Sequence, residues 1–241
     1  MKRISVLIPA AGKGSRSGLE YPKNLFVIQD KPILMRIYEK IADIDDRPTI
    51  VINPIDKIKY EEIMLKYKVF FECVFQENPK GMGDAILKFK QSKMYDETEN
   101  ILLIWGDIPF LQKETIKKLL TTHFEKNNHF TFVTRKVKEP YTVVERDREG
   151  NVKGVAETRE CGGETIEGER DIGLFIFKSK VVFELLEQEL KGKYGQLTGE
   201  HGFLYIISHL YEKGYQIEAI PIATELDTIS FNQISDIEGY I

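Results

Sequence analysis

The residues best suited to chemistry stand in the loop that follows the first apolar segment. That segment ends at Pro9, and positions 10–18 read Ala-Ala-Gly-Lys-Gly-Ser-Arg-Ser-Gly. Glycines allow backbone N–H groups to approach a phosphate closely and to turn toward its oxygens. Lys13, Arg16 and Lys23 bring three cations against one acidic residue. These types and spacings predict a loop that binds a phosphorylated ligand, with a solvated basic turn as the alternative.

Two well-known glycine-rich loops do not fit this spacing. A P-loop needs two glycines separated by four residues and followed by Lys and Ser or Thr, and no such run occurs in the chain. The dinucleotide fingerprint Gly-x-Gly-x-x-Gly would start at Gly12, but Ser17 occupies the position of its third glycine. Pro22 and the apolar run after it also oppose a helix at this point. The loop therefore belongs to another class.

A second candidate is the carboxylate at the end of a later apolar run. Asp107 follows the run 101–105 and a glycine, and a carboxylate at the ligand edge of a sheet is a ligand that Mg²⁺ accepts. A helix N-cap is the alternative, but the next residues, Ile108-Pro109-Phe110, oppose a helix that begins at once. Asp107 is therefore a predicted metal ligand.

The elements that would position these residues alternate along the first part of the chain. Short runs rich in Val, Ile and Phe predict strands, and apolar residues three or four apart predict amphipathic helices. We expect strands at 4–9, 49–53, 69–76, 101–107 and 130–135, and helices at 32–44, 57–67, 83–95 and 114–126. This alternation predicts a mostly parallel sheet covered on both faces.

The pattern changes after about residue 141. A turn at 148–151 predicts a hairpin, and the rest of the chain predicts a strand at 172–177, helices at 181–190 and 203–212, a strand at 215–222 and a terminal helix. No repeat or linker separates this part from the first. We therefore expect one domain over residues 1–241, with hairpins and loops inserted on the same sheet.

Composition narrows the class of protein. The 241 residues carry 34 basic and 38 acidic side chains, a net charge of −4, and 42% are hydrophobic. These values exclude a disordered chain and argue against a protein that coats nucleic acid or an anionic membrane. Cys73 and Cys161 form no disulfide framework or metal pair, and the four histidines are scattered. With no run of about 20 apolar residues, we expect a cytoplasmic protein without membrane insertion or nucleic-acid partner, of open oligomeric state.

The first loop resembles the signature of the nucleotide-sugar pyrophosphorylases, also called sugar-1-phosphate nucleotidyltransferases. Their Ala-Gly-x-Gly-x-Arg corresponds to positions 11–16, and their Pro-Lys to Pro22 and Lys23. Three further segments resemble the family in the same order: 76–85, 105–107 and 226–228. The chain is most similar to the uridylyltransferase domain of the bacterial UDP-N-acetylglucosamine pyrophosphorylase, which has a MobA-like NTP transferase fold.

This resemblance implies a fold and a reaction. The fold is a Rossmann-like, GT-A-like three-layer α/β/α domain with a mixed, mostly parallel sheet and a hairpin-rich acceptor-binding insertion. The nucleotide-binding half is 1–136, and 137–241 holds the acceptor-binding half and a terminal metal segment. The reaction is Mg²⁺-dependent: a sugar 1-phosphate attacks the α-phosphorus of a nucleoside triphosphate, expected to be UTP, and pyrophosphate leaves. The resemblance places the product, a nucleotide sugar, in cell-envelope polysaccharide biosynthesis.

The resemblance also assigns site residues, position by position. The catalytic pair is Arg16 and Lys23, and the metal ligands are Asp107 and Asp227. The residues assigned to nucleotide binding are Ala10, Ala11, Gly12, Lys13, Gly14, Gln76 and Gly81. Acceptor binding falls to Thr142, Glu157 and Asp171.

The chain departs from this subfamily mainly around the acceptor. Asp171 replaces the sugar-binding asparagine, and an ionised carboxylate cannot donate hydrogen bonds as an amide does. Thr142 replaces a glycine, Asp227 replaces the terminal metal asparagine, and Met82 replaces the threonine of a Gly-Thr-Gly segment. The acceptor therefore stays open. A cytidylyltransferase acting on phosphocholine or another small phosphate is one alternative, and a non-catalytic nucleotide-sugar sensor is the other.

Overall fold

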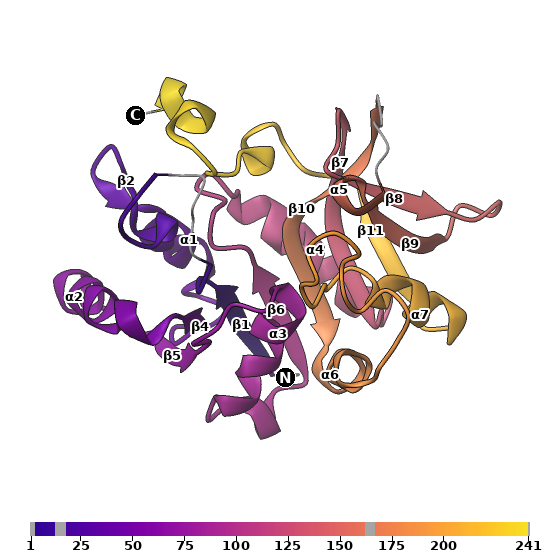
Figure 1. Cartoon of the computed structure of the whole chain (residues 1–241), viewed down its shortest axis with the longest axis horizontal. Helices are drawn as coiled ribbons and strands as arrows, with labels where there is room; N and C mark the ends of the chain where they lie inside the picture. The colour runs from indigo at the N-terminus through magenta and orange to yellow at the C-terminus, as the bar shows by residue number, and fades with distance from the viewer. Residues whose placement is uncertain (1–2, 13–17, 162–166, 241) are drawn as a thin grey trace.

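A seven-stranded sheet runs through the structure (Figure 1). The structure is a computed structural model that describes residues 3–12, 18–161 and 167–240, without the side chains of Arg159 and Cys161. In spatial order, the strands are β11 (Ile217–Ile220), β7 (Phe130–Lys138), β10 (Glu167–Lys178), β6 (Asn100–Ile104), β1 (Ile4–Pro9), β4 (Thr49–Ile52) and β5 (Glu72–Phe75). Strand β10 pairs antiparallel with β6 and β7, and the other pairs in this sheet are parallel. The predicted mixed, mostly parallel sheet is confirmed.

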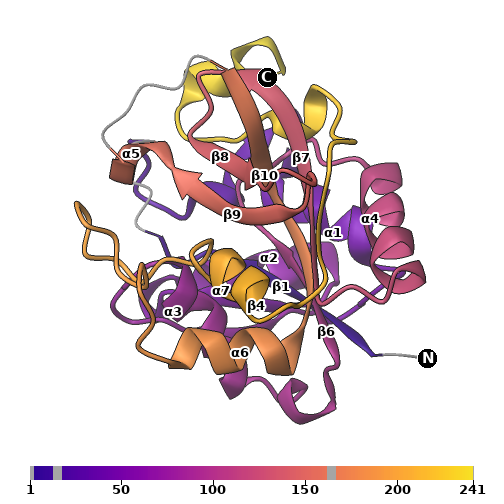
Figure 2. The ribbon, with the colours of Figure 1, turned by 90° about the vertical axis from the view of Figure 1, so that its right-hand side faces the viewer.

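Helices cover both faces of this sheet. They are α1 (Ile33–Ile41), α2 (Lys57–Tyr67), α3 (Met82–Leu87), α4 (Lys113–Glu125), α6 (Ser179–Glu187) and α7 (Ile206–Glu212), whereas the short α5 (Thr158–Cys161) follows strand β9 (Val152–Glu157) outside these layers. Side chains alternate along a strand, so Val6 and Ile8 of β1 join one core with α1, α2 and α4, whereas Leu7 joins another with α3, α6 and α7. Figure 2 shows α4 on one side of the sheet and α6 and α7 on the other. The predicted three-layer architecture is confirmed.

Two small hairpins stand apart from the main sheet. Strands β2 (Val27–Ile28) and β3 (Lys31–Pro32) follow the first loop, and β8 (Thr142–Arg146) pairs with β9 (Val152–Glu157) in the second part of the chain. Val144 and Val152 of the β8–β9 hairpin join the core that contains α7. The hairpin predicted around 148–151 is thus present, and it packs onto the helical layer next to the sheet.

Two predicted helices differ from the structure. The helix expected at 83–95 ends at Leu87 and continues as short 3₁₀ turns, because Phe89 enters the core while the Ser92 hydroxyl donates to Glu72. The terminal helix is a 3₁₀ segment, η7 (Ile234–Tyr240). Within the described ranges, the longest helix is the 13-residue α4, and no helix has the length and apolarity needed to cross a membrane.

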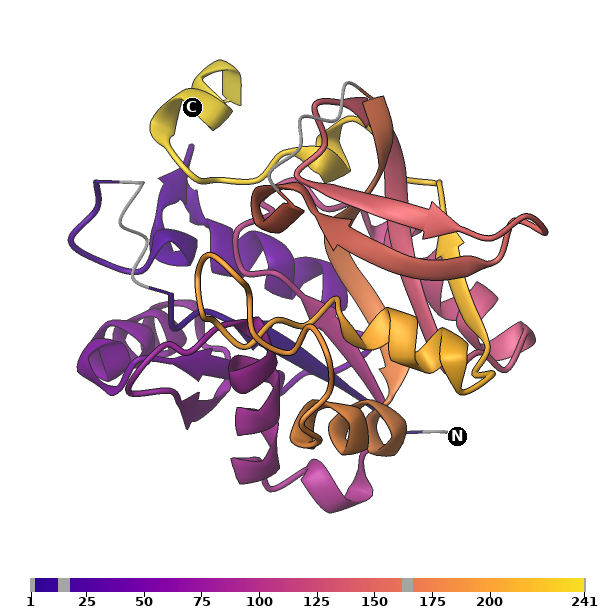
Figure 3. The same cartoon turned by 45° about the vertical axis from the view of Figure 1, so that its right-hand side comes forward.

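The last segment of the chain returns to the first loop. After β11 it crosses over one edge of the sheet toward the β2–β3 hairpin, as the yellow ribbon shows in Figures 1 and 3. Phe231 is fully buried, and its ring lies 4.6 Å from the ring of Phe26. Its backbone N–H donates to the carbonyl oxygen of Asp107 at 2.7 Å. Three segments distant in sequence therefore meet at this edge.

Candidate active site

The site is built where β1 and β6 end side by side. Both strands run parallel, so the loops that follow them leave the sheet at the same edge. Gly106 allows the close approach, because a Cβ at this position would lie 2.9 Å from the carbonyl oxygen of Pro9. This contact brings Asp107 next to the loop that begins at Ala10.

A cation and two oxygen-bearing side chains form the centre of the site. Lys23 Nζ donates to Asp107 Oδ2 at 2.5 Å and to Asn232 Oδ1 at 3.4 Å. The side chains of Lys23 and Asp107 are 25% and 16% exposed, so the pair is partly withdrawn from water but open to a ligand. The other carboxylate oxygen of Asp107, Oδ1, is buried and has no hydrogen-bond partner among the residues that the structure describes.

Lys23 is held by the short 3₁₀ turn η2 (Lys23–Leu25). The next two residues, Asn24 and Leu25, are buried and anchor this turn in the core. Tyr60 of α2 donates its hydroxyl to Asn24 Oδ1 at 2.8 Å, and burial raises the pKa of Tyr60 well above its usual range. The tyrosine therefore stays a neutral donor, and the turn presents Lys23 to the site.

Asn232 is a candidate that the sequence analysis missed. Its Nδ2 donates to the hydroxyl of Ser230 at 3.2 Å, which directs the amide oxygen toward Lys23. The carboxylate of Asp236 accepts the backbone N–H of Asn232 at 2.8 Å and holds the turn. The sequence did contain a signal for it. The family carries a metal-binding asparagine near the C-terminus, and Asn232 is an asparagine five residues after Asp227, the position matched to it from the sequence.

The structure shows hydrogen-bond partners for the predicted metal ligand Asp227. Its carboxylate is fully buried and accepts hydrogen bonds from the N–H of Gln112, the hydroxyl of Thr115, and the N–H and hydroxyl of Thr224, at 2.7–2.9 Å. Because Gln112 and Thr115 lie at the start of α4, Asp227 caps this helix from outside. A metal there would have to break these hydrogen bonds. The C-terminal segment brings Asn232, not Asp227, to Asp107.

The residues at the centre fit a hard divalent cation. A carboxylate and an amide oxygen are the ligand types that Mg²⁺ prefers, and Mg²⁺ commonly takes only one or two carboxylates together with water and substrate phosphates. Asp107 offers a buried oxygen that no described residue engages, and Asn232 offers an amide oxygen that contacts the same Lys23 ammonium as the Asp107 carboxylate. No group of three or more His, Cys, Asp or Glu side chains that could hold a metal occurs among residues 3–12, 18–161 and 167–240.

The second loop, between β5 and α3, brings Gln76 and Gly81 together. Gln76 is 3% exposed, and its Nε2 donates to Asp84 Oδ2 at 2.6 Å and to the Gly81 carbonyl at 3.4 Å. Gly81 has a φ of 110°, a conformation that L residues rarely adopt. Asp84 is a second residue that the sequence analysis missed, although its place in the first turn of the predicted helix was visible.

The segment between α6 and α7 fastens this second loop. The N–H of His201 donates to the carbonyl of Lys80 at 2.7 Å, and the N–H of Gly83 donates to the carbonyl of His201 at 3.0 Å. A Cβ at Gly83 would lie 2.6 Å from Cδ2 of His201. Figure 3 shows this orange segment over the purple ribbon of the first part of the chain. Burial lowers the pKa of His201.

The three predicted acceptor residues lie together. Thr142 and Glu157 are partners in the β8–β9 ladder, and the Thr142 hydroxyl donates to Asp171 Oδ2 at 2.7 Å. Asp171 Oδ1 accepts the N–H of Gly173 at 2.9 Å. Asp171 is fully buried, and burial above all raises its pKa, with a smaller contribution from the Glu157 charge. Both oxygens of Asp171 are therefore engaged, whereas Glu157 is half-buried.

An aromatic pair connects this acceptor group with the centre of the site. The rings of Trp105 and Tyr141 lie 6.4 Å apart and nearly parallel, and the guanidinium of Arg170 lies 4.5 Å from the Tyr141 ring centre. Burial raises the pKa of Tyr141, and the charges of Asp171 and Asp107 contribute in the same direction. Tyr141 is therefore close enough to both Asp171 and Asp107 for their charges to affect its hydroxyl. Sequence reasoning had given it no role.

The first loop is only partly described. Ala10 is half-buried and donates its N–H to the Val51 carbonyl at 2.7 Å, Ala11 is buried, and Gly12 is exposed with open space around it. The other predicted residues of this loop lie outside the described residues: Lys13, Gly14 and Arg16.

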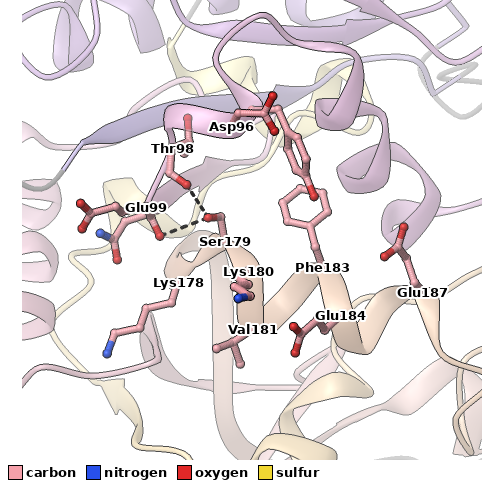
Figure 4. A pocket seen from close by; sticks show the side chains of 12 residues that line it. Asp96, Thr98, Glu99, Lys178, Ser179, Lys180, Val181, Phe183, Glu184 and Glu187 are labelled. Carbon is pink, nitrogen blue, oxygen red and sulfur yellow. Dashed lines mark hydrogen bonds between the residues drawn. The ribbon is translucent and has the colours of Figure 1, made fainter.

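An open hollow lies at the other end of β6. The hydroxyl of Ser179 there donates to the carbonyl oxygens of Thr98 and Glu99, at 2.5 and 3.2 Å, and Phe183 lines the hollow beside them (Figure 4). Asn100, the first residue of β6, belongs to its lining, whereas Asp107 follows the last. None of the predicted site residues that the structure describes lines this hollow.

Comparison with known proteins shows the family of this chain. The sequence model of the MobA-like NTP transferase domain matches residues 6–199. The "Bifunctional protein GlmU" of Carboxydothermus hydrogenoformans is 29% identical over 229 residues, which cover 94% of this chain and 49% of that protein. Its counterpart in Thermodesulfovibrio yellowstonii is 31% identical over 235 residues, with coverage of 95% and 49%. The chain thus spans about half the length of the curated relatives it matches.

A solved structure shares the fold. The 4-diphosphocytidyl-2C-methyl-D-erythritol synthase of Anaerococcus prevotii superimposes with a TM-score of 0.66, covering 99% of this chain and 96% of that one. The two sequences are 17% identical, so this likeness concerns the fold alone.

Proposed function

The chain belongs to the family of MobA-like NTP transferase domains, and we propose that it transfers a uridylyl group from UTP to a sugar 1-phosphate. Pyrophosphate and a nucleotide sugar would be the products. The observation that carries this proposal is the cluster of Lys23, Asp107 and Asn232 at the shared edge of β1 and β6. It combines a lysine ammonium with two side-chain oxygens of types that Mg²⁺ accepts, at the edge where open α/β sheets bind ligands.

The reaction needs charge neutralisation more than proton transfer. The attacking phosphate and the triphosphate are both anions, and the attacking oxygen is already ionised near pH 7. Alignment and electrostatic stabilisation therefore supply most of the rate. Bound Mg²⁺ would neutralise charge on the phosphate oxygens. Asp107 and Asn232 would hold it, which frees the Lys23 ammonium from Asp107 to contact both reactants as a flexible point charge. Arg16 would clamp the triphosphate from the first loop.

The acceptor would be bound on the side of β8 and β9. Glu157 is half-buried at the end of β9 and would accept hydrogen bonds from sugar hydroxyls. Asp171 and Thr142 would support this acceptor-binding surface through their mutual hydrogen bond. Because both oxygens of Asp171 are already engaged, a direct contact between Asp171 and the acceptor would need that hydrogen bond to open.

Pyrophosphate release tests the proposal directly. We would assay the purified chain with Mg²⁺ and each of the four nucleoside triphosphates against several sugar 1-phosphates, phosphocholine and a polyol phosphate. The proposed function predicts the highest turnover with UTP and a sugar 1-phosphate, and a large loss in Asp107→Asn. Turnover with CTP and phosphocholine would favour a cytidylyltransferase. Binding of a nucleotide sugar without any turnover would favour a sensor.

A further inference from the structure

We propose that Asp84 is a positioning residue that fixes which end of the Gln76 amide faces the nucleotide base. The inference rests on the proposed function and on the family resemblance, which implies that Gln76 contacts the edge of the nucleotide base. It concerns the orientation of the Gln76 side-chain amide, which the glutamine alone does not determine. A glutamine amide can present either its NH₂ group or its oxygen, since the two orientations have almost the same shape.

The hydrogen bonds around Gln76 select one orientation. Its Nε2 lies 2.6 Å from Asp84 Oδ2, and a carboxylate can only accept, so this contact requires the NH₂ end. The Gly81 carbonyl, also an acceptor, lies 3.4 Å from the same nitrogen. A flipped amide would set its oxygen against both acceptors. The amide oxygen Oε1 is therefore the group that remains for a ligand, since both side-chain hydrogen bonds of Gln76 to described residues use Nε2.

Asp84 is itself held in place. It lies in the first turn of α3, where the helix dipole favours a negative charge. Its second oxygen, Oδ1, lies 3.7 Å from Nζ of Lys88, one turn further along the helix. Gln76 is 3% exposed, so its side chain has little room to leave the contact. These contacts hold the Nε2 end of the Gln76 amide against Asp84 and leave Oε1 as the acceptor.

A hydrogen-bond acceptor at this position distinguishes uracil from cytosine. Uracil carries a hydrogen on ring nitrogen N3 between its two carbonyl groups, whereas N3 of cytosine carries none and is itself an acceptor. Oε1 would accept from N3–H of uracil, but it would meet a lone pair on cytosine. Cytosine would have to shift until its amino group reached the same oxygen. The locked amide therefore favours UTP over CTP, and the preference originates in Asp84.

The variant Asp84→Asn tests this lock. Asparagine has nearly the same size but can donate as well as accept, so it supports the Gln76 amide in either orientation. We would measure kcat/KM for UTP and CTP with one acceptor, and the Kd of both nucleotides by titration. We expect the native chain to prefer UTP at least tenfold. The variant should reduce that ratio about tenfold, which corresponds to about 1.4 kcal/mol.

The control is Glu114→Gln, which removes an acidic residue from the first turn of α4 at an exposed position. It should leave the ratio unchanged. A ratio in Asp84→Asn within twofold of the native value, or a native preference for CTP, would overturn the inference. The Kd values decide this without turnover, so a chain that binds but does not react contradicts the proposed function alone.

A nucleotide analogue gives a second test on the unaltered chain. In 3-deazauridine triphosphate a carbon replaces N3, so the base loses this N–H donor. We expect it to bind at least tenfold more weakly than UTP to the native chain, and with a smaller penalty to Asp84→Asn. Equal binding of the two nucleotides to the native chain would show that Oε1 accepts nothing from the base.

Discussion

Lys23 is the side chain on which the proposed chemistry depends most directly. Its ammonium is the cation that the structure places against the Asp107 carboxylate. Lys23→Ala should lower kcat at least 100-fold, or about 3 kcal/mol of transition-state stabilisation. The Kd for the nucleoside triphosphate should change less than tenfold, because other contacts bind the ground state. Pyrophosphate release and nucleotide titration measure the two effects.

The control for Lys23→Ala is Lys126→Ala, which removes an exposed lysine paired with Glu218 far from the first loop in the sequence. It should leave both values unchanged. A sensor would respond in the opposite way: Lys23→Ala would weaken binding, and there would be no turnover to lose.

Asp171 makes a prediction about pH and stability. Burial raises the pKa of this carboxyl in the folded chain above its ordinary value of 3.8. A raised pKa means that the folded state favours the protonated form, so its contribution to stability is complete at low pH and is lost as pH rises through the folded pKa. Relative to Asp171→Asn, the native chain should therefore lose stability as pH increases above about 3.8. Urea unfolding of both proteins over that range measures it.

Asp147 provides a control of opposite sign for this pH dependence. Hydrogen bonds, above all from the Asn151 side chain, lower the pKa of this carboxyl. Its contribution to stability is present above the ordinary pKa and disappears as pH falls through the lowered one. Relative to Asp147→Asn, the native chain should lose stability toward acid. If the stability difference between the native chain and Asp171→Asn changed with pH in the same direction as that between the native chain and Asp147→Asn, the raised pKa of Asp171 and the lowered pKa of Asp147 would be contradicted.

At the scale of elements, the second loop depends on the segment that crosses it between α6 and α7. Gly83→Ala would press a methyl group against the backbone carbonyl oxygen of Gly202 and place it 2.6 Å from the His201 ring, so backbone must move. We expect a loss of about 1–3 kcal/mol in the free energy of unfolding and a rise of at least fivefold in KM for the nucleotide, because Gln76 lies on the displaced loop. Thermal unfolding and steady-state kinetics check this.

The control for Gly83→Ala is Gly239→Ala, where a methyl group would meet nothing within 4 Å. Its stability and KM should match those of the native chain. If Gly83→Ala destabilised the protein with no change in KM, the His201 segment would support the fold without positioning the nucleotide.

Elements with local signals were predictable from the sequence. Strand β1 was predicted with its observed bounds, because an aliphatic run ending at Pro9 can pair on both sides. Helix α2 was also predicted with its observed bounds. The helix expected after residue 83 was too long, because contacts of Phe89 and Ser92 with other segments override the local helical pattern. Local periodicity carries no information about such contacts.

Site residues were predictable from the sequence where a reactive side chain follows directly after a recognisable strand. Asp107 follows a buried strand and lies at the ligand edge as expected, beside Lys23. Asn232 was missed because it is 209 residues from Lys23, and its orientation depends on Ser230 and the fold-back of the last segment. Asp227 was the more obvious candidate because it is a carboxylate, but that carboxylate accepts hydrogen bonds from the start of α4. A sequence lists the available ligands, and the tertiary fold decides which of them meet.

For the whole molecule, the site closes only when the two ends of the chain meet. The first loop supplies Lys23, the middle of the chain supplies Asp107, and the last segment supplies Asn232. Phe231 fastens that last segment through its ring contact with Phe26 and its backbone hydrogen bond to Asp107. Docking of the last segment is therefore a condition for the proposed metal site, and not only for stability.

Phe231→Ala tests this condition against an equally buried aromatic residue elsewhere. Both Phe231→Ala and Phe183→Ala should lower the free energy of unfolding by about 3–5 kcal/mol, since each removes a buried ring. Phe183 lies on α6, beside the hollow at the other end of β6. Only Phe231→Ala should raise the Mg²⁺ concentration for half-maximal turnover, at least tenfold, because Asn232 loses its position. Equal Mg²⁺ requirements in the two variants, measured below their unfolding temperatures, would mean that the last segment supplies no ligand.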